Sequence, residues 1–108
     1  MGKVVHIEVV SKTPPGGRCE FYDRTFFYLV KTSKNLYYTL IPENLYSGNV
    51  KGPAVLINGR EVVPEDGVLL TGDELFKALK ESGVDFKEDE EKVRNRLEQE
   101  YKKFVGGV

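Results

Sequence analysis

The sequence contains a single cysteine, Cys19, and this residue is the best candidate for covalent chemistry. If Cys19 opens a helix, the helix dipole and the free backbone N–H groups of the first turn lower the pKa of its thiol, and the adjacent Arg18 adds to the effect. One thiol cannot form an internal disulfide. The chemistry that remains is a mixed disulfide with a small thiol, persulfide carriage or a disulfide between subunits. The alternative is that Cys19 is a small buried side chain, as free cysteines usually are.

His6 is the only histidine, so a zinc site would depend on carboxylates for most of its ligands. We therefore expect no metal and no cofactor. A catalytic dyad of His6 and Cys19 would require the two side chains to meet in space, and nothing in the sequence brings them together. The stretch PPGGR (residues 14–18) could hold an anion through successive N–H groups if a helix follows, but a plain loop is the alternative.

The chain has 108 residues, of which 40% are hydrophobic and 31% charged, and this composition fits one domain over residues 1–108. A net charge of −1 and a pI near 5.9 give no general attraction to nucleic acid or to an anionic membrane. No apolar run approaches the roughly 20 residues that span a bilayer. The N-terminus lacks the layout of a signal peptide, so we expect a cytoplasmic protein. The prominence of Lys and Glu is typical of a thermophile.

The first half of the chain contains one ambiguous segment. Residues 4–10 alternate apolar and polar side chains, which predicts a strand, and residues 12–18 form a loop because two prolines and two glycines disfavour regular structure. Residues 19–41 allow two interpretations. Either residues 19–31 form a helix and residues 36–41 a strand, or the segment is an antiparallel hairpin, which the local strand propensity favours.

A hairpin is predicted in the middle of the chain. Residues 54–57 form one strand, Asn58-Gly59 a type I′ turn and residues 60–63 the returning strand. The preceding residues 42–52 are expected to be irregular.

Two helices are predicted after the hairpin. The first covers residues 71–82 and starts with a capping box of Thr71 and Glu74. The second covers about residues 85–105, with another capping box that starts at Asp85. Its apolar side chains form a narrow stripe: Val93, Leu97, Tyr101 and Phe104. This stripe either packs on its own domain or pairs with a second copy, and we favour a homodimer.

The order of elements from residue 53 onward resembles the second half of a thioredoxin or glutaredoxin domain. In that superfamily a cis-proline precedes the third strand and lies against the reactive cysteine site. The matching features here are Pro53, the strand AVLI, the turn Asn58-Gly59, the strand REVV and the helix DELFKALKES. Upstream, the superfamily has a strand and then a CxxC motif at a helix N-terminus. VVHIEVV followed by GGRC stands in that order, with Cys19 matching the second cysteine and Gly16 replacing the first.

This resemblance covers residues 4–83 and implies an α/β (or α+β) fold, with a thioredoxin-like small central sheet, flanking helices and an added C-terminal helix. It favours the helix over the hairpin for residues 19–31, since a parallel crossover needs about that much chain. It implies substrate contacts at four residues: Gly17, Arg18, Gly52 and Pro53. The chain departs from the superfamily in its missing first cysteine, in the irregular segment before Pro53 and in the added last helix.

A ubiquitin-like β-grasp fold is a further alternative, suggested by INGREVV, TGDEL and Gly106-Gly107. In that superfamily the diglycine ends the active chain, whereas Val108 follows it here. The long charged helix before the diglycine also has no place in that topology.

Two functions therefore remain open. The first is a monothiol redox or thiol-carrier role through Cys19, with a small thiol or a protein as partner. The second is a non-catalytic module that acts by homodimerisation or by binding a protein partner. The aromatic residues favour core packing and an interaction surface over base stacking, because tyrosine is enriched at protein interfaces. They are Phe21, Tyr22, Phe26, Phe27, Tyr28, Tyr37, Tyr38 and Tyr46.

Overall fold

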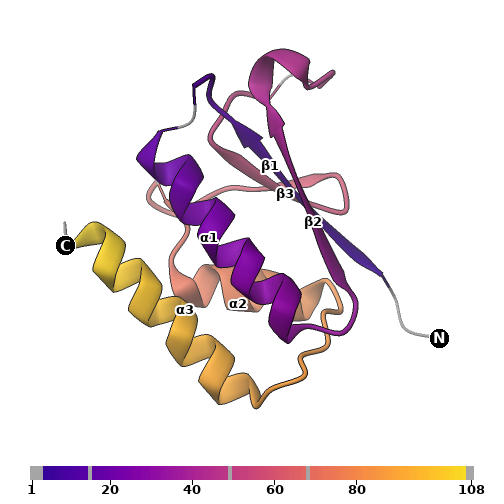
Figure 1. The fold of residues 1–108 in the computed structure, drawn as a ribbon, viewed down its shortest axis with the longest axis vertical. Coiled ribbons are helices and arrows are strands. Elements are labelled where there is room, and N and C mark those ends of the chain that lie inside the picture. Colours follow the sequence, from indigo (N-terminus) through magenta and orange to yellow (C-terminus); the bar gives the residue numbers. More distant parts are fainter. Residues whose placement is uncertain (1–3, 15, 49, 68, 107–108) are drawn as a thin grey trace.

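The computed structural model describes residues 4–14, 16–48, 50–67 and 69–106. Within these residues the chain alternates strands and helices in its first half and ends in two helices (Figure 1). In order, the elements are β1 (Val5–Ser11), α1 (Gly17–Thr32), β2 (Leu36–Pro42), the short 3-10 helix η1 (Glu43–Leu45), β3 (Ala54–Ile57), β4 (Arg60–Val62), α2 (Gly72–Glu81) and α3 (Glu90–Val105). The predicted α/β fold is confirmed.

The sheet is mixed, with the strand order β2-β1-β3-β4. β1 is parallel to β2, from Val5 opposite Leu36 onward, and antiparallel to β3. β3 and β4 form the predicted hairpin, and both turn residues have positive φ (51° at Asn58 and 84° at Gly59), as a type I′ turn requires. The parallel pairing of β1 and β2 through a helix differs from the hairpin that opens a β-grasp fold, so that alternative is wrong.

Residues 19–41 form the helix α1 followed by the strand β2, so the helix interpretation is confirmed and the predicted hairpin is wrong. Three of the strand-forming aromatic residues of α1, Phe21, Tyr22 and Phe26, lie in the core and are almost fully buried. Burial of one such side chain contributes about 1.5–3 kcal/mol, which exceeds the few tenths of a kcal/mol per residue by which helix propensities differ. Packing on the sheet therefore outweighs the local preference for strand.

The helices pack on one face of the sheet. The main core joins β-strand residues such as Val5, Ile7 and Val9 to side chains of α1, α2 and α3. On the other face a small cluster of Val10, Ala54 and Leu56 is covered by side chains that include those of the segment following β2. No helix among the described residues is long and apolar enough to cross a membrane.

The two C-terminal helices differ in how well their starts were predicted. The capping box of Thr71 and Glu74 at the start of α2 is confirmed. The predicted start of the last helix at Asp85 is wrong, because α3 begins at Glu90 with Asp89 as its N-cap. The residues before Asp89 are held by the end of α1 instead.

Phe86 explains this difference. It forms a β-bridge with Ser33, and its ring stacks on Phe76 at 5.8 Å between centroids. The Lys34 N–H donates to the Asp85 carbonyl at 2.8 Å, so the backbone here is paired with a distant segment and cannot enter a helix.

The apolar stripe of α3 packs inside its own domain. Val93 and Leu97 are buried, and the Phe104 ring lies 5.0 Å from that of Phe21 in α1. The stripe is therefore not available for the pairing with a second copy that we expected of it. A homodimer would have to use another surface.

Candidate functional site around Cys19

Cys19 lies in the first turn of α1, beside the end of β1. Gly16 is the N-cap, so Cys19 is the third helical residue, and 1% of its surface is exposed. The N-cap glycine provides no side chain to cap the helix. The groups around the sulfur come from the helix start and from Ser11 and Lys12 at the end of β1.

The pKa of the Cys19 thiol lies below its ordinary value. Burial alone would raise this pKa, but hydrogen bonds from the Ser11 side chain and from the backbone of Gly16 and Lys12 stabilise the thiolate, and the charge of Arg18 adds to them. Together these contributions outweigh the cost of burial. Although Cys19 has almost no accessible surface, it is one of the residues that line a surface pocket.

The pocket has a volume of about 230 Å³ and is lined by Cys19, Glu20, Asp23 and Leu40. The Tyr38 hydroxyl donates a hydrogen bond of 2.6 Å to Asp23 Oδ1. Burial and the neighbouring Asp23 carboxylate raise the pKa of Tyr38 well above its ordinary value, so this hydroxyl remains a donor. The pocket thus combines a thiol, two carboxylates and an apolar wall.

Of the four residues predicted to contact substrate, Gly17 and Arg18 flank Cys19 in the first turn of α1. Gly17 packs on Phe104, whose ring lies 3.7 Å from the position of a Cβ on Gly17. Arg18 acts on Cys19 through its charge. Neither residue lines the pocket described above.

Gly52 and Pro53 lie at the start of β3, and the peptide bond that joins them is cis. A Cβ on Gly52 would lie 2.6 Å from the Lys12 nitrogen and from the Ser11 carbonyl carbon, so only glycine allows this close approach to β1. The Gly52 N–H donates to Glu43 Oε1 at 2.9 Å. Gly52 and Cys19 therefore both approach Ser11, the last residue of β1, and Lys12, which follows it.

His6 does not reach this site. It alternates along β1 with Val5 and Ile7, whose side chains enter the core under α1, so it lies on the opposite face of the sheet. There its ring stacks on Tyr37 at 4.5 Å between centroids and makes a 3.1 Å hydrogen bond with Thr39 Oγ1. The dyad with Cys19 is thus ruled out by the pleat of β1. The described residues also include no group of three or more His, Cys, Asp or Glu side chains that could hold a metal ion.

Sequence reasoning missed Ser11, Asp23 and Tyr38. Asp23 follows Cys19 by four residues, and this spacing on a helix would have placed the two side chains on one face. Ser11 carried no such signal, because its approach to Cys19 depends on where β1 ends relative to α1.

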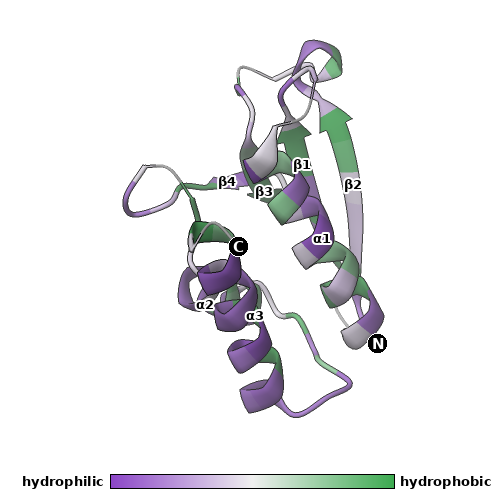
Figure 2. Cartoon of the chain, turned by 60° about the vertical axis from the view of Figure 1, so that its left-hand side comes forward, coloured by the Kyte–Doolittle hydropathy of each residue, from purple (hydrophilic) through white to green (hydrophobic). Residues whose placement is uncertain are grey.

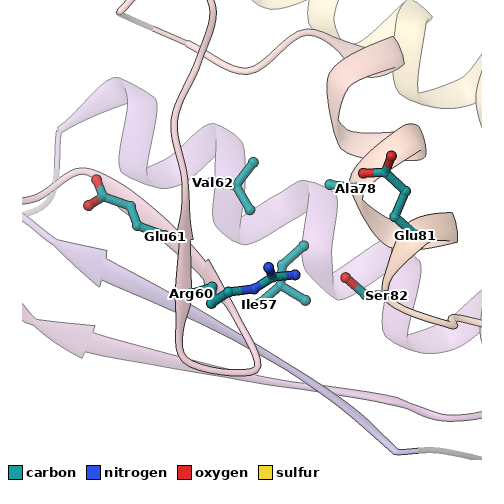
Figure 3. A pocket seen from close by; sticks show the side chains of 7 residues that line it. All are labelled: Ile57, Arg60, Glu61, Val62, Ala78, Glu81 and Ser82. Atoms are coloured by element: carbon teal, nitrogen blue, oxygen red, sulfur yellow. The ribbon is translucent and has the colours of Figure 1, made fainter.

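A second hollow lies between the β3–β4 hairpin and α2, with a volume of about 220 Å³. Figure 3 shows Arg60 directed toward the end of α2, where Glu81 and Ser82 lie, while Glu61 points away. The three charged residues are exposed, and no thiol or histidine lines the hollow. The Cys19 pocket is therefore the better candidate for chemistry.

No family model, curated protein or solved structure matches the chain. Its function is accordingly inferred from the geometry around Cys19 and from the order of its strands and helices.

Proposed function

We propose that the chain is a thioredoxin-like protein in which Cys19 acts as a single reactive thiol. The order β1-α1-β2 followed by β3-β4-α2, with the sheet order β2-β1-β3-β4, supports this scaffold. Pro53 immediately precedes β3, and its neighbour Gly52 lies close to Ser11 and Lys12, the residues beside Cys19 at the end of β1. Three features depart from the superfamily: Gly16 in place of the first cysteine, only the short helix η1 between β2 and β3, and the added α3.

The position of Cys19 in the first turn of α1, beside Ser11 and Lys12 and at the edge of a surface pocket, is the observation that carries the proposal. The N–H groups of Gly16 and Lys12 are fixed by the backbone, whereas the Ser11 hydroxyl can turn. It donates to the Lys12 carbonyl at 2.8 Å in the present structure. Because a hydroxyl has one hydrogen, Ser11 would redirect it to the sulfur when Cys19 loses its proton. The site is thus arranged to stabilise the charged form of Cys19, as a nucleophilic thiol requires.

The proposed reaction is thiol–disulfide exchange. The Cys19 thiolate attacks one sulfur of a small disulfide, a new S–S bond forms to Cys19, and the original S–S bond breaks. The other half of the disulfide leaves as a thiolate and takes a proton from water. The small disulfide is the oxidant, so no further reactant is needed, and a second small thiol reverses the step.

The pocket favours a particular class of partner. Glu20 and Asp23 place negative charge at the approach to Cys19, and Leu40 adds an apolar wall. A small disulfide that is neutral or cationic therefore fits better than one that carries carboxylates, because like charges repel at close range.

Native labelling of Cys19 tests the proposal. We expect cystamine and hydroxyethyl disulfide to modify the folded protein faster than oxidised glutathione does. The rate should rise with pH to a midpoint below that of the same chain unfolded in urea, because the thiolate forms at lower pH in the fold. The Cys19→Ala variant is the control for non-specific labelling. Modification that occurs only on unfolding would contradict a reactive role.

A non-catalytic module on the same scaffold is the second candidate, and the burial of Cys19 favours it. Only 1% of the residue is exposed, and the exposed position where the superfamily has its first cysteine is occupied by Gly16. In this case the native labelling of Cys19 would be slow with all three disulfides. The chain would then act through its surface, and Cys19→Ala would leave partner binding unchanged.

A further inference from the structure

β2 is an edge strand that lacks the usual protection against pairing. The sheet order places it outermost, and among the described residues no strand pairs with its outer side. Its sequence LYYTLIP contains no charged residue, and its one proline is the last residue. Edge strands usually carry charges, internal prolines or bulges that prevent pairing with another chain. Figure 2 shows β2 at the open side of the sheet, beyond α1.

Within the part of the chain that the structure describes, the backbone of β2 directs a regular set of groups away from the sheet on this side. The Val5 N–H of β1 donates to the Asn35 carbonyl at 2.8 Å, just before β2 begins. In a parallel ladder every second residue bonds to the same neighbour, so Tyr37, Thr39 and Ile41 direct their N–H and C=O groups to β1. The alternate residues direct theirs outward. They are Leu36, Tyr38 and Leu40.

A line of exposed side chains runs along the outer face of α1, and it starts beside the same edge. Glu20 and Asp23 line the pocket with Leu40 of β2, which locates this side of the helix. Phe27 and Lys31 follow at helical spacing on the outer face of α1, where both also line a hollow with Arg96 of α3. Phe27 is 62% exposed, and the Lys31 Nζ lies 5.0 Å from the centroid of its ring. This side of α1 is therefore acidic near its N-terminus, apolar in the middle and basic near its C-terminus.

We propose that two copies of the chain form a homodimer by antiparallel pairing of β2 with β2. A twofold axis perpendicular to the sheet at Tyr38 would pair the outward groups of Tyr38 with those of Tyr38 in the second copy, and those of Leu36 with those of Leu40. Two four-stranded sheets would then form one continuous sheet of eight strands. The interface is isologous, so the same patch on each copy must complement itself.

The helices satisfy that condition. α1 packs over both β1 and β2, so the rotation would place the two α1 helices side by side at two strand spacings, or about 9.5 Å, which is a normal distance between packed helices. Tyr38 contacts Asp23 and Phe26, which lie between Glu20 and Lys31 in α1. The axis at Tyr38 therefore brings Glu20 of one copy opposite Lys31 of the other. This surface is distinct from the α3 stripe but includes Glu20 and Leu40, which also line the Cys19 pocket. The dimer would therefore restrict access to Cys19, so the labelling of Cys19 is measured at concentrations at which the protein is monomeric.

Amide exchange measured by NMR over a concentration series, together with light scattering, tests the pairing. We expect a dimer in which the amides of Tyr38 and Leu40 exchange about as slowly as those of Thr39 and Ile41, and in which only the first two lose protection on dilution. A protein that stays monomeric up to its solubility limit would overturn the proposal, as would a dimer in which the amides of Tyr38 and Leu40 exchange rapidly. A monomer whose β2 edge binds an added extended peptide would assign the edge to another partner and would also overturn it.

Charge reversal tests the orientation of the two copies. Glu20 and Lys31 are exposed, so Glu20→Lys and Lys31→Glu should leave the fold intact. Each single reversal opposes like charges at two symmetric places and should raise the dissociation constant about tenfold or more, and the double variant should return it close to the original value. Lys77→Glu, an exposed reversal on α2, is the matched control. Single reversals that change the dissociation constant no more than Lys77→Glu does would overturn the proposed orientation.

Discussion

α1 and α2 start with the same arrangement of backbone but with different side chains. In each helix the first residue is a glycine that lies against α3: Gly17 packs on the Phe104 ring, and Gly72 lies against the α3 backbone at Leu97 and Glu98. The N-cap and the third helical residue then differ. They are Thr71 and Glu74 in α2, and Gly16 and Cys19 in α1.

The start of α2 has its backbone donors satisfied by side chains. The Thr71 hydroxyl oxygen accepts from the Glu74 N–H at 3.1 Å, and Glu74 Oε1 accepts from the Thr71 N–H at 2.8 Å. The second Glu74 oxygen accepts from the Glu65 N–H at 2.7 Å, and Glu98 of α3 accepts from the Asp73 N–H at 2.9 Å. These bonds fix the helix start and the loop before it.

The start of α1 keeps only half of this arrangement. Gly16 has no side chain to accept from the first turn, but the Cys19 sulfur takes the place of the Glu74 carboxylate and lies within reach of the N-cap N–H. A carboxylate in that position is charged at neutral pH and stabilises the helix. A thiol in the same position is stabilised in its charged form by the helix. The comparison therefore indicates that the first turn of α1 favours the thiolate at some cost to helix stability.

Removing the Glu74 carboxylate should have the largest effect on stability. Glu74→Ala deletes two charge-assisted hydrogen bonds to the backbone N–H groups of Thr71 and Glu65. We expect the free energy of unfolding to fall by about 2 kcal/mol, measured by urea denaturation with circular dichroism. Glu81→Ala, at an exposed position at the end of the same helix, should change it by less than about 0.5 kcal/mol. Equal losses of unfolding free energy in the two variants would show that the Glu74 cap stabilises the fold no more than an exposed side chain of the same helix does.

The same contrast explains which parts of the fold could be predicted from sequence. The start of α2 and the turn at Asn58-Gly59 depend on residues close together in the chain, and both were predicted correctly. α1 required knowledge of distant contacts, because Phe, Tyr and Thr favour strands and only burial against the sheet makes this segment helical. Local propensity alone pointed to the hairpin.

The predicted start of α3 was wrong for a related reason. Asp85 and Asp89 are equally good N-caps by residue type, and the choice between them is made by the bridge between Ser33 and Phe86. At the site, the place of Cys19 in the first turn of a helix was implied by the resemblance to the thioredoxin order, and the length of chain between β1 and β2 left room for that helix. Its contact with Ser11 did not, because that depends on how two elements align in space.

Restoring a cap to α1 should make its start resemble that of α2. Nothing lies within 4 Å of a Cβ built on Gly16, and its φ of −100° and ψ of −170° suit any residue. Gly16→Ser supplies a hydroxyl that can accept from N–H groups of the first turn, whereas Gly16→Ala supplies only the Cβ. We expect Gly16→Ser to be more stable than Gly16→Ala by about 1 kcal/mol, and more stable than the original chain by a few tenths of a kcal/mol, in urea denaturation. Equal stability of the two variants would mean that these N–H groups are already satisfied.

The pH dependence of stability should show the smallest effect, and it isolates the thiol of α1. The pKa of Cys19 is lower in the folded chain than its ordinary value of about 9, so between these two values the folded state has released a proton that the unfolded state still binds. Stability from this source is therefore absent below the folded pKa, grows as the pH rises through it and is fully present above the unfolded pKa. We expect the difference in unfolding free energy between the original chain and Cys19→Ala to increase in favour of the original chain as the pH rises from 6 to about 9.5.

Taking this difference removes the contribution of the tyrosines. Burial raises the pKa values of Tyr22, Tyr28 and Tyr38, so their ionisation in the unfolded state lowers stability at high pH, but it does so in both chains. A difference that stays constant across the range would show that the fold does not favour the Cys19 thiolate, and α1 would then begin like α2 with one capping bond fewer. A difference that rises with pH would establish that the two helix starts serve different purposes: one stabilises the fold, and the other stabilises a charged sulfur.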